Sequence, residues 1–226
     1  MKKVFRKELK YRISKIEFNK LNRILEKEMT LDDHGQDGGY WIRSIYFDSE
    51  YDNDLQDVLG GYYNKAKLRL RIYSLQQKWV KLEYKCKIGS DQTKYTLQIT
   101  REQAQKMIRG EYGFLMGIHD EIAAEIYVRL ISNAYRPKVM IEYQRLAYIY
   151  DVNDTRITFD TDVKASMDVR DLFSPIPASI PLIPGDTGVL EIKYNHFLCS
   201  FIQRALTFIE VNQVANSKYA MGRLSL

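Results

Sequence analysis

The chain has 226 residues, of which 45% are hydrophobic and 28% are charged, so it has the composition of a globular protein and intrinsic disorder is excluded. Its net charge of +5, from 34 basic and 29 acidic residues, permits an anionic partner without naming one. Two cysteines exclude a disulfide framework. The sequence shows no signal peptide and no stretch near the ~18 apolar residues of a membrane helix. It therefore predicts a cytoplasmic protein that does not itself span a membrane.

Eight strands and five helices are predicted along the chain from side-chain alternation, apolar stripes and turn residues. The strands cover residues 4–13, 42–48, 65–74, 78–88, 93–99, 137–150, 155–160 and 188–194. Two helices begin at the capping boxes that open with Ser14 and Thr100, and three more cover 49–59, 120–133 and 196–209. No linker divides these elements, so we predict a single domain over residues 1–226.

The strand at 65–74 is cationic on one face and apolar on the other. Alternate side chains of a strand share a face, so its four cations lie together; they are Lys65, Lys67, Arg69 and Arg71. A solvated sheet face explains one such strand, but similar charged or polar faces recur at Arg6–Arg12, Lys81–Lys87, Lys94–Gln98, Arg156–Asp160 and Glu191–Lys193. One sheet built from these strands would carry a dense field of Lys, Arg and Glu on one side, which predicts a binding site for a polyanion.

Two architectures fit strands of this kind. In the first, an open sheet lays its apolar face on helices and exposes the basic face to solvent. In the second, the sheet closes into a barrel with the charged side inward and the helices packed outside, and about eight strands suffice for closure. The mixture of Glu with Lys and Arg favours the second, because buried like charges must be balanced by acids, metal or ligand. We therefore predict an α+β fold around an eight-stranded antiparallel β-barrel with a charged interior.

Short motifs follow one another along the chain in a definite order. They are Glu8-Leu9-Lys10-Tyr11, Ile45-Tyr46-Phe47-Asp48, Arg69-Leu70-Arg71, Leu82-Glu83-Tyr84-Lys85 with Lys94, Arg145, Arg156-Ile157-Thr158-Phe159-Asp160, Leu190-Glu191-Ile192-Lys193-Tyr194 and Ser217-Lys218-Tyr219. In this order and with these spacings they resemble the catalytic domain of the vacuolar transporter chaperone (VTC) family. That family is the polyphosphate polymerase branch of the triphosphate tunnel metalloenzymes, a CYTH-like superfamily. Each motif is weak alone, but the ordered series is specific and covers essentially the whole chain.

The resemblance implies an antiparallel tunnel whose walls bind a triphosphate chain, with Mn²⁺ or Mg²⁺ at one end. Carried over by position, the catalytic residues lining the tunnel would be Lys10, Arg69, Arg71, Lys85, Lys94, Arg145, Arg156, Lys193 and Lys218. Among these, the residues implied to bind the nucleotide or phosphate chain are Arg69, Arg71, Lys85 and Lys218. Glu191 would be the metal ligand, with Glu8 and Glu83 as helpers.

The chain departs from the family pattern at three positions. Arg6 stands where the first Glu of the ExExK strand would be, and Ala215 replaces a basic residue three positions before Lys218. Arg145 has the wrong parity relative to Glu142 and Gln144 for one regular strand, so either a bulge intervenes or its assignment is wrong.

Three functions remain open at this stage. The leading one is transfer of the terminal phosphoryl group of ATP to a polyphosphate chain, since phosphoryl transfer needs chiefly positioning and neutralised charge. The second is a metal-dependent triphosphatase or tripolyphosphatase with water as acceptor, and the third is a non-catalytic module that senses polyphosphate or nucleotides. The predicted partners are ATP, polyphosphate and pyrophosphate, with a separately encoded membrane protein as a further candidate. Nucleic acid is not expected, because tyrosines such as Tyr11, Tyr84 and Tyr95 fall on apolar strand faces.

Overall fold

The computed structural model describes residues 6–35, 38–89, 91–175, 177–210 and 217–226. The chain divides into two compact units. The first comprises Met1–Trp41, Tyr143–Val163 and Pro181–Asn216, and the second comprises Ile42–Glu142, Lys164–Ile180 and Ser217–Leu226. Whether they act as the predicted single domain stays a prediction.

Ten strands are present in the described part of the chain, and all eight predicted strands are among them. They are β1 (Arg6–Ser14), β2 (Thr30–Leu31), β3 (Tyr40–Asp48), β4 (Asn64–Ile72), β5 (Trp79–Ile88), β6 (Asp91–Thr100), β7 (Arg136–Tyr150), β8 (Thr155–Ser166), β9 (Ile180–Pro181) and β10 (Thr187–Asn195). Their hydrogen-bonded order is β1-β10-β8-β7-β3-β4-β5-β6, with β2 on β7 and β9 on β8. The two additional strands have only two residues each, too short for an alternating pattern to predict them.

The fold prediction is confirmed in part. Strands and helices are mixed, and the strand pairs with a recorded register are antiparallel. The order of strands has two ends, β1 and β6, and no pairing between them is seen among the described residues. Closure into an eight-stranded barrel is therefore not confirmed.

Six α-helices occur in the same parts of the chain: α1 (Lys15–Glu28), α2 (Asn53–Leu59), α3 (Arg101–Ile108), α4 (Glu121–Ser132), α5 (Ser200–Leu206) and α6 (Lys218–Ser225). Two short 3₁₀ helices cover Gly113–Gly117 and Val152–Asp154. Both predicted capping boxes are present, with Ser14 and Glu17 at α1 and Thr100 and Gln103 at α3. Of the helices described, none combines the length and the apolar character needed to cross a membrane.

Two helices are shorter than predicted, and a backbone angle explains each. Asp52 has a φ of 58°, so α2 begins after it at Asn53 rather than at Ser49. His196 has a φ of 57° and Cys199 has a non-helical ψ of 145°, so α5 begins later, at Ser200. A residue in this left-handed region cannot continue a right-handed helix, so these positions interrupt patterns that look helical in the sequence.

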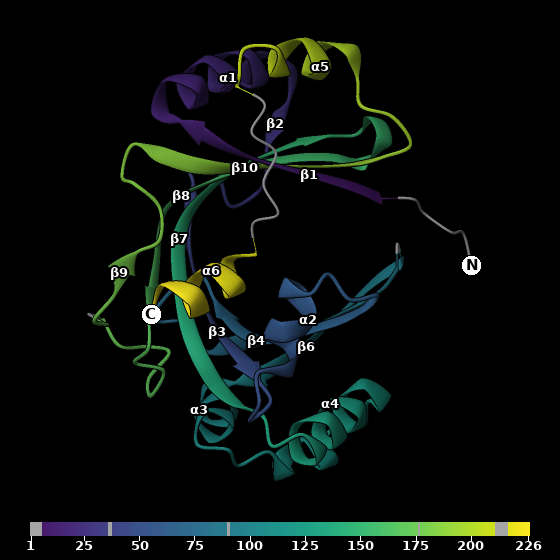
Figure 1. Ribbon diagram of the computed structural model, residues 1–226, viewed down its shortest axis with the longest axis vertical. Coiled ribbons are helices and arrows are strands. Elements are labelled where there is room, and N and C mark those ends of the chain that lie inside the picture. The colour runs from purple at the N-terminus through teal and green to yellow at the C-terminus, as the bar shows by residue number, and fades with distance from the viewer. Residues whose placement is uncertain (1–5, 36–37, 90, 176, 211–216) are drawn as a thin grey trace. The chain divides into compact units, whose positions relative to one another are not determined.

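The apolar core of the first unit fixes which strand face carries charge. Leu21 and Leu25 of α1 and Ile202 of α5 lie in one buried cluster with Leu190 and Ile192 of β10. In Figure 1 these two helices lie together beside β1 and β10. Because the helices cover the apolar side of these strands, alternation directs the charged residues of β1 and β10 to the opposite side.

The second unit repeats this division on β4 and β5. Leu68 and Leu70 of β4 and Leu82 of β5 are completely or almost completely buried. Helix α2 contacts β4, and α3 contacts both β5 and β6. The cationic residues of β4 and β5 therefore share the face turned away from this core.

Asp48, at the end of β3, joins two helices of the second unit. Its buried carboxylate accepts hydrogen bonds from the backbone N–H groups of Ser49 at 2.7 Å and of Asp54 and Leu55 at 2.9 Å. The hydroxyl of Tyr219 in α6 donates to the same carboxylate at 2.5 Å. One buried charge thus satisfies N–H groups at the start of α2 and anchors α6.

We expect Tyr219→Phe to lower the free energy of unfolding by about 1.5–3 kcal/mol, because it deletes a hydrogen bond to a buried charged acceptor. Urea denaturation measures this change. Tyr51→Phe is the matched control, since the Tyr51 side chain is 84% exposed and its hydroxyl is in water. Equal stability of the two variants would show that Asp48 does not depend on Tyr219.

Candidate functional site

A lysine ladder crosses β4, β5 and β6 of the second unit. The strand register places Lys65 opposite Lys87, Lys67 opposite Lys85, and Lys85 opposite Lys94. Like charges directly opposite one another destabilise a sheet. A run of such pairs is therefore unfavourable unless anions bind to it, and we define these five residues as the lysine ladder.

Glu83 is the acid beside this ladder. Its carboxylate accepts from Arg69 Nε at 2.6 Å, lies 3.5 Å from Arg71 Nη1 and makes a close ion pair with Lys94. The Glu83 side chain is only 2% exposed. Burial raises the pKa of Glu83, but Arg69, Arg71 and Lys94 together outweigh it and hold the pKa well below its usual range. Glu83 is thus a fixed negative charge that orients three cations.

Residues of β3 accept hydrogen bonds from the guanidinium groups of Arg69 and Arg71. Tyr46 and Ser44 stand opposite Arg69 and Arg71 in the register. Arg69 Nη1 donates to the Tyr46 hydroxyl at 2.9 Å, and Arg71 Nε donates to Ser44 Oγ at 3.2 Å. Burial raises the pKa of Tyr46, but Arg69 and Arg71 lower it to about 8. The arginines are therefore restrained by β3 and β5 before any ligand binds.

The N-terminus of α6 lies next to the same strand. Lys67 Nζ donates to Ser217 Oγ at 2.8 Å, and Ser217 accepts from the N–H of Ala220 as the N-cap of α6. Lys218 is the first residue of that helix. A helix N-terminus favours anions through its N–H groups and dipole, so α6 adds to the positive potential of this face.

The first unit carries a second charged cluster, the β1–β10 quartet of Glu8, Lys10, Glu191 and Lys193. Glu8 is opposite Lys193, and Lys10 is opposite Glu191, so each acid faces a lysine. Lys10 Nζ lies 2.5 Å from Glu8 Oε1 and 3.5 Å from Glu191 Oε2. Lys193 Nζ lies 3.9 Å from Glu8 Oε2 and forms a close ion pair with Glu191. The four side chains therefore form an alternating, charge-balanced square.

The neighbours of the quartet shift its titration. Burial and Glu191 raise the pKa of Glu8, but Lys10 and Lys193 outweigh them, so the pKa is lowered. Burial lowers the pKa of Lys10, whereas Glu191 and Glu8 raise it above its ordinary value. Both groups are accordingly charged near neutral pH.

Glu8 and Glu191 are compatible with a divalent cation that also binds phosphate. No group of three or more His, Cys, Asp or Glu side chains that could hold a metal occurs in the described ranges. Mg²⁺ and similar ions, however, commonly use one or two carboxylates together with substrate phosphates and water. Thr158 of β8 is opposite Glu191, and its buried Oγ1 has no hydrogen-bond partner. The quartet therefore has two acidic oxygen donors and a neighbouring unsatisfied hydroxyl.

Arg145 and Arg156 of the first unit are each held by an acid. Arg145 forms a two-pronged ion pair with the fully buried Asp160, at 2.6 and 2.7 Å. Arg156 Nη2 donates to Asp32 at 2.7 Å and to the Tyr40 hydroxyl at 3.1 Å. Burial raises the pKa of Tyr40 to about 12, although Arg145 and Arg156 lower it. Both arginines are therefore held in place by acids.

Burial along β7 does not follow one regular alternation. Met140 and Ile141 are both buried in the second unit, and Ala147 and Tyr148 are both buried in the first. Parity relative to Glu142 and Gln144 therefore does not decide the face of Arg145, whose side chain pairs with Asp160.

The predicted site residues separate into two groups. The second unit holds Arg69, Arg71, Glu83, Lys85, Lys94 and Lys218, and the first holds Glu8, Lys10, Arg145, Arg156, Glu191 and Lys193. Sequence reasoning missed Ser44, Tyr46, Thr158 and Ser217. Strand register was the missing signal for Ser44, Tyr46 and Thr158, because each stands opposite a predicted site residue. Ala215 lies outside the described residues.

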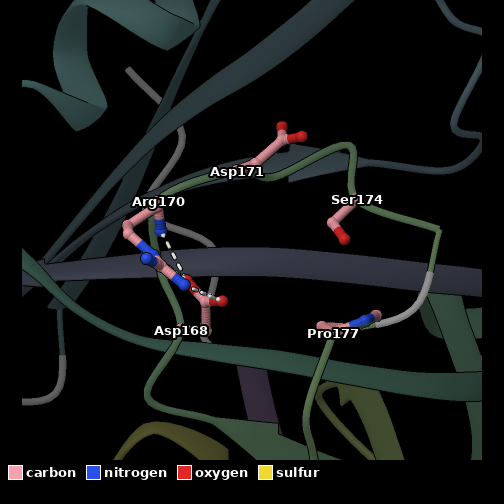
Figure 2. A pocket seen from close by; sticks show the side chains of 5 residues that line it. All are labelled: Asp168, Arg170, Asp171, Ser174 and Pro177. Carbon is pink, nitrogen blue, oxygen red and sulfur yellow. Dashed lines mark hydrogen bonds and ion pairs between the residues drawn. The ribbon is translucent and has the colours of Figure 1, made fainter.

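A shallow pocket lies in the loop between β8 and β9, away from these strand faces. Figure 2 shows Asp168, Arg170, Asp171, Ser174 and Pro177 around it. Arg170 is paired with Asp168, and Asp171 accepts a hydrogen bond from Gln105. The charged groups drawn there are already matched within the loop or to α3, so this pocket does not resemble the cation-rich ladder.

Comparison with known proteins supports the motif series. The model of the VTC domain family matches residues 5–226. A candidate adenylate cyclase from Vibrio parahaemolyticus has a TM-score of 0.55 at 13% identity, with 100% of each chain covered. A candidate adenylate cyclase from Bacillus halodurans has a TM-score of 0.51 at 12% identity, with 94% of this chain and 95% of that chain covered. At these identities the likeness shows the fold alone, and no curated protein matches the sequence significantly.

Glu83→Gln should destabilise the protein by about 3 kcal/mol, because it leaves buried or half-buried cations without their acid. The pKa of Glu83 is lower in the folded than in the unfolded protein, so its stabilisation is present above pH ~4.5 and is lost as the pH falls below that value. Thermal denaturation from pH 7 to pH 3 should therefore show a weaker acid dependence in the variant. Glu102→Gln, which alters an exposed helical pair with Lys106, is the control. Equal effects of both substitutions would contradict the role given to Glu83.

Proposed function

The chain belongs to the VTC domain family, and we propose that it is a metal-dependent polyphosphate polymerase that transfers the terminal phosphoryl group of ATP to a polyphosphate chain. The observation that carries this proposal is the lysine ladder, whose opposed like charges call for a polyanion. Nucleic acid is a poorer candidate, since strand tyrosines such as Tyr11 and Tyr84 are buried and cannot stack on bases. The proposal includes a charge-lined tunnel, ATP as the phosphoryl donor and a location in the cytoplasm.

Arg69 and Arg71 bind phosphate oxygens with forked N–H donors, and Lys85, Lys94 and Lys218 supply point charges. Tyr46, Ser44 and Glu83 set the two guanidinium groups in advance. This restraint reduces the reorganisation needed when charge develops on the transferring group. Phosphoryl transfer needs little covalent help from protein, so held cations are the main contribution required of this unit.

The reaction is an exchange of one phosphorus–oxygen bond for another. A terminal oxygen of the polyphosphate attacks the γ-phosphorus of ATP, the bond from that phosphorus to the β,γ-bridging oxygen breaks, and ADP leaves. The chain grows by one phosphate. With water as the attacking group the same cations would support hydrolysis, which is the alternative that product analysis separates from polymerisation.

The metal in this proposal is Mn²⁺ or Mg²⁺, held by Glu191 and Glu8. When bound, such an ion neutralises phosphate oxygens and orients them. Lys10 and Lys193 form ion pairs with the two carboxylates and position them. Glu83 is already in contact with three cations, which suits a counter-ion better than a metal ligand, so we assign it to orienting Arg69, Arg71 and Lys94.

With ATP and Mn²⁺ the purified protein should produce a ladder of phosphate chains on a gel, and Glu191→Gln should abolish it while leaving tripolyphosphate binding intact. The substitution removes a carboxylate charge but keeps the shape of the side chain. Isothermal titration with tripolyphosphate and with Mn²⁺ separates the two effects.

Three results would redirect the assignment. Free phosphate without chains indicates a triphosphatase. Binding without turnover in the unmodified protein indicates a sensor module. Full turnover of Glu191→Gln means that the metal is held by other residues.

Arg69→Ala combined with Arg71→Ala should abolish tripolyphosphate binding, because it removes the forked donors at the centre of the face. Circular dichroism reports whether this double variant folds. Lys85→Gln combined with Lys94→Gln alters more exposed residues and should weaken binding by about tenfold or more for each contact. Lys106→Gln on α3 removes one positive charge outside the strand face and is the control. Unchanged affinity in both double variants would remove the phosphate site from β4–β6.

A further inference from the structure

Two tyrosines at the beginning of β4 differ from the buried tyrosines of the strands. Tyr62 and Tyr63 directly precede the strand, and their side chains are 63% and 70% exposed. By contrast, Tyr84 in the neighbouring strand is almost completely buried. Core packing, which explains most strand tyrosines here, does not account for this pair.

Tyr63 is held in place by a glycine. The N–H of Gly89 donates to the Tyr63 carbonyl at 2.9 Å, which places the two residues opposite each other just beyond the β4–β5 pair of Asn64 and Ile88. A Cβ added to Gly89 would lie 2.6 Å from Cε2 of the Tyr63 ring. The ring therefore lies directly against the Gly89 backbone, which only a residue without a side chain permits. The high exposure of the ring shows that its remaining surface is open to solvent.

The position of Tyr63 continues the lysine ladder. Tyr63 is two residues before Lys65, and Gly89 is two residues after Lys87, so the Tyr63 ring on Gly89 lies next to one end of the lysine ladder. At ~3.3 Å per residue, Tyr63 lies roughly 13 Å along the strand from Lys67. An extended nucleoside triphosphate has a comparable length from its base to its terminal phosphate. One ligand could therefore contact the ring at one end and the ladder at the other.

We propose that Tyr63 is a stacking platform for the base of the nucleoside triphosphate substrate, whose phosphates lie along Lys65, Lys87, Lys67 and Lys85. This inference rests on the proposed function, to which it adds a base-binding residue and three phosphate contacts, Lys65, Lys67 and Lys87. The ring is already restrained against Gly89, so little side-chain freedom is lost when a base stacks on it. Stacking on one open ring does not read hydrogen-bonding groups, so the site accepts different bases and favours the larger purines.

The test compares ATP with tripolyphosphate, which has the same phosphate chain but no base. Isothermal titration of both ligands into the unmodified protein, Tyr63→Ala, Tyr63→Phe and Tyr62→Ala provides the comparison. We expect Tyr63→Ala to weaken ATP binding by about 5- to 150-fold and to leave tripolyphosphate binding unchanged. Tyr63→Phe keeps the ring and should bind both ligands normally. Tyr62→Ala is the matched control, because Tyr62 is similarly exposed but its ring lies against Gly60 rather than Gly89.

The failure of this inference is distinguishable from that of the proposed function. If Tyr63→Ala binds ATP as tightly as the unmodified protein, stacking is wrong and the phosphate site stands. If Tyr63→Ala weakens both ligands equally, the ring supports the strand rather than the base, and stacking is again wrong. If the unmodified protein binds neither ligand, both proposals fall together.

Discussion

Opposed like charges across β4, β5 and β6 are the constraint on which the rest of this site depends. Two side chains directly opposite each other on a sheet are about 4.5–5.5 Å apart at Cβ, so paired lysines repel unless an anion neutralises them. The apolar faces of the same strands are buried by the core of the second unit, which leaves the cations no other side to occupy. A sequence needed only for folding would relieve this repulsion with acids on alternate strands. Here Glu83 is the acid placed among these cations, and it contacts Arg69, Arg71 and Lys94.

The β1–β10 quartet solves the charge problem in the opposite way. Glu8 and Glu191 alternate with Lys10 and Lys193, so the cluster is balanced without a ligand. A partly buried ion pair contributes little net stability once the cost of removing both charges from water is counted. The ion pairs of the quartet therefore serve mainly to orient its side chains, since each lysine holds a neighbouring carboxylate in place. The ladder of the second unit consists of lysines, whereas the quartet of the first unit alternates acids with lysines.

Much of the fold could be predicted because apolar and charged residues alternate along each strand of the sequence. The eight longer strands follow from alternation, and the two capping boxes follow from Ser14 with Glu17 and Thr100 with Gln103. The shortened starts of α2 and α5 could not be predicted, because an apolar stripe does not show that Asp52 and His196 take left-handed conformations. The contacts of Tyr46 and Ser44 with the arginines could not be predicted for a related reason. A strand sequence shows which residues share a face, but only the register shows that these two stand opposite Arg69 and Arg71.

The two carboxylates of the quartet also bear on whether the protein is an enzyme or a passive binder. A module that only captured phosphate chains would be weakened by acids on a phosphate-binding face, because each repels the ligand and neutralises a lysine. Glu83 does not weaken phosphate binding in this way, since its carboxylate is buried and positions the arginines. Glu8 and Glu191 would weaken it, because their side chains are more accessible than that of Glu83 and already neutralise Lys10 and Lys193. A cation that binds both carboxylate and phosphate converts this repulsion into attraction. The Thr158 hydroxyl, opposite Glu191, makes no hydrogen bond and is a further oxygen ligand on this face. The charge pattern of the quartet therefore favours metal-dependent phosphoryl transfer over simple binding.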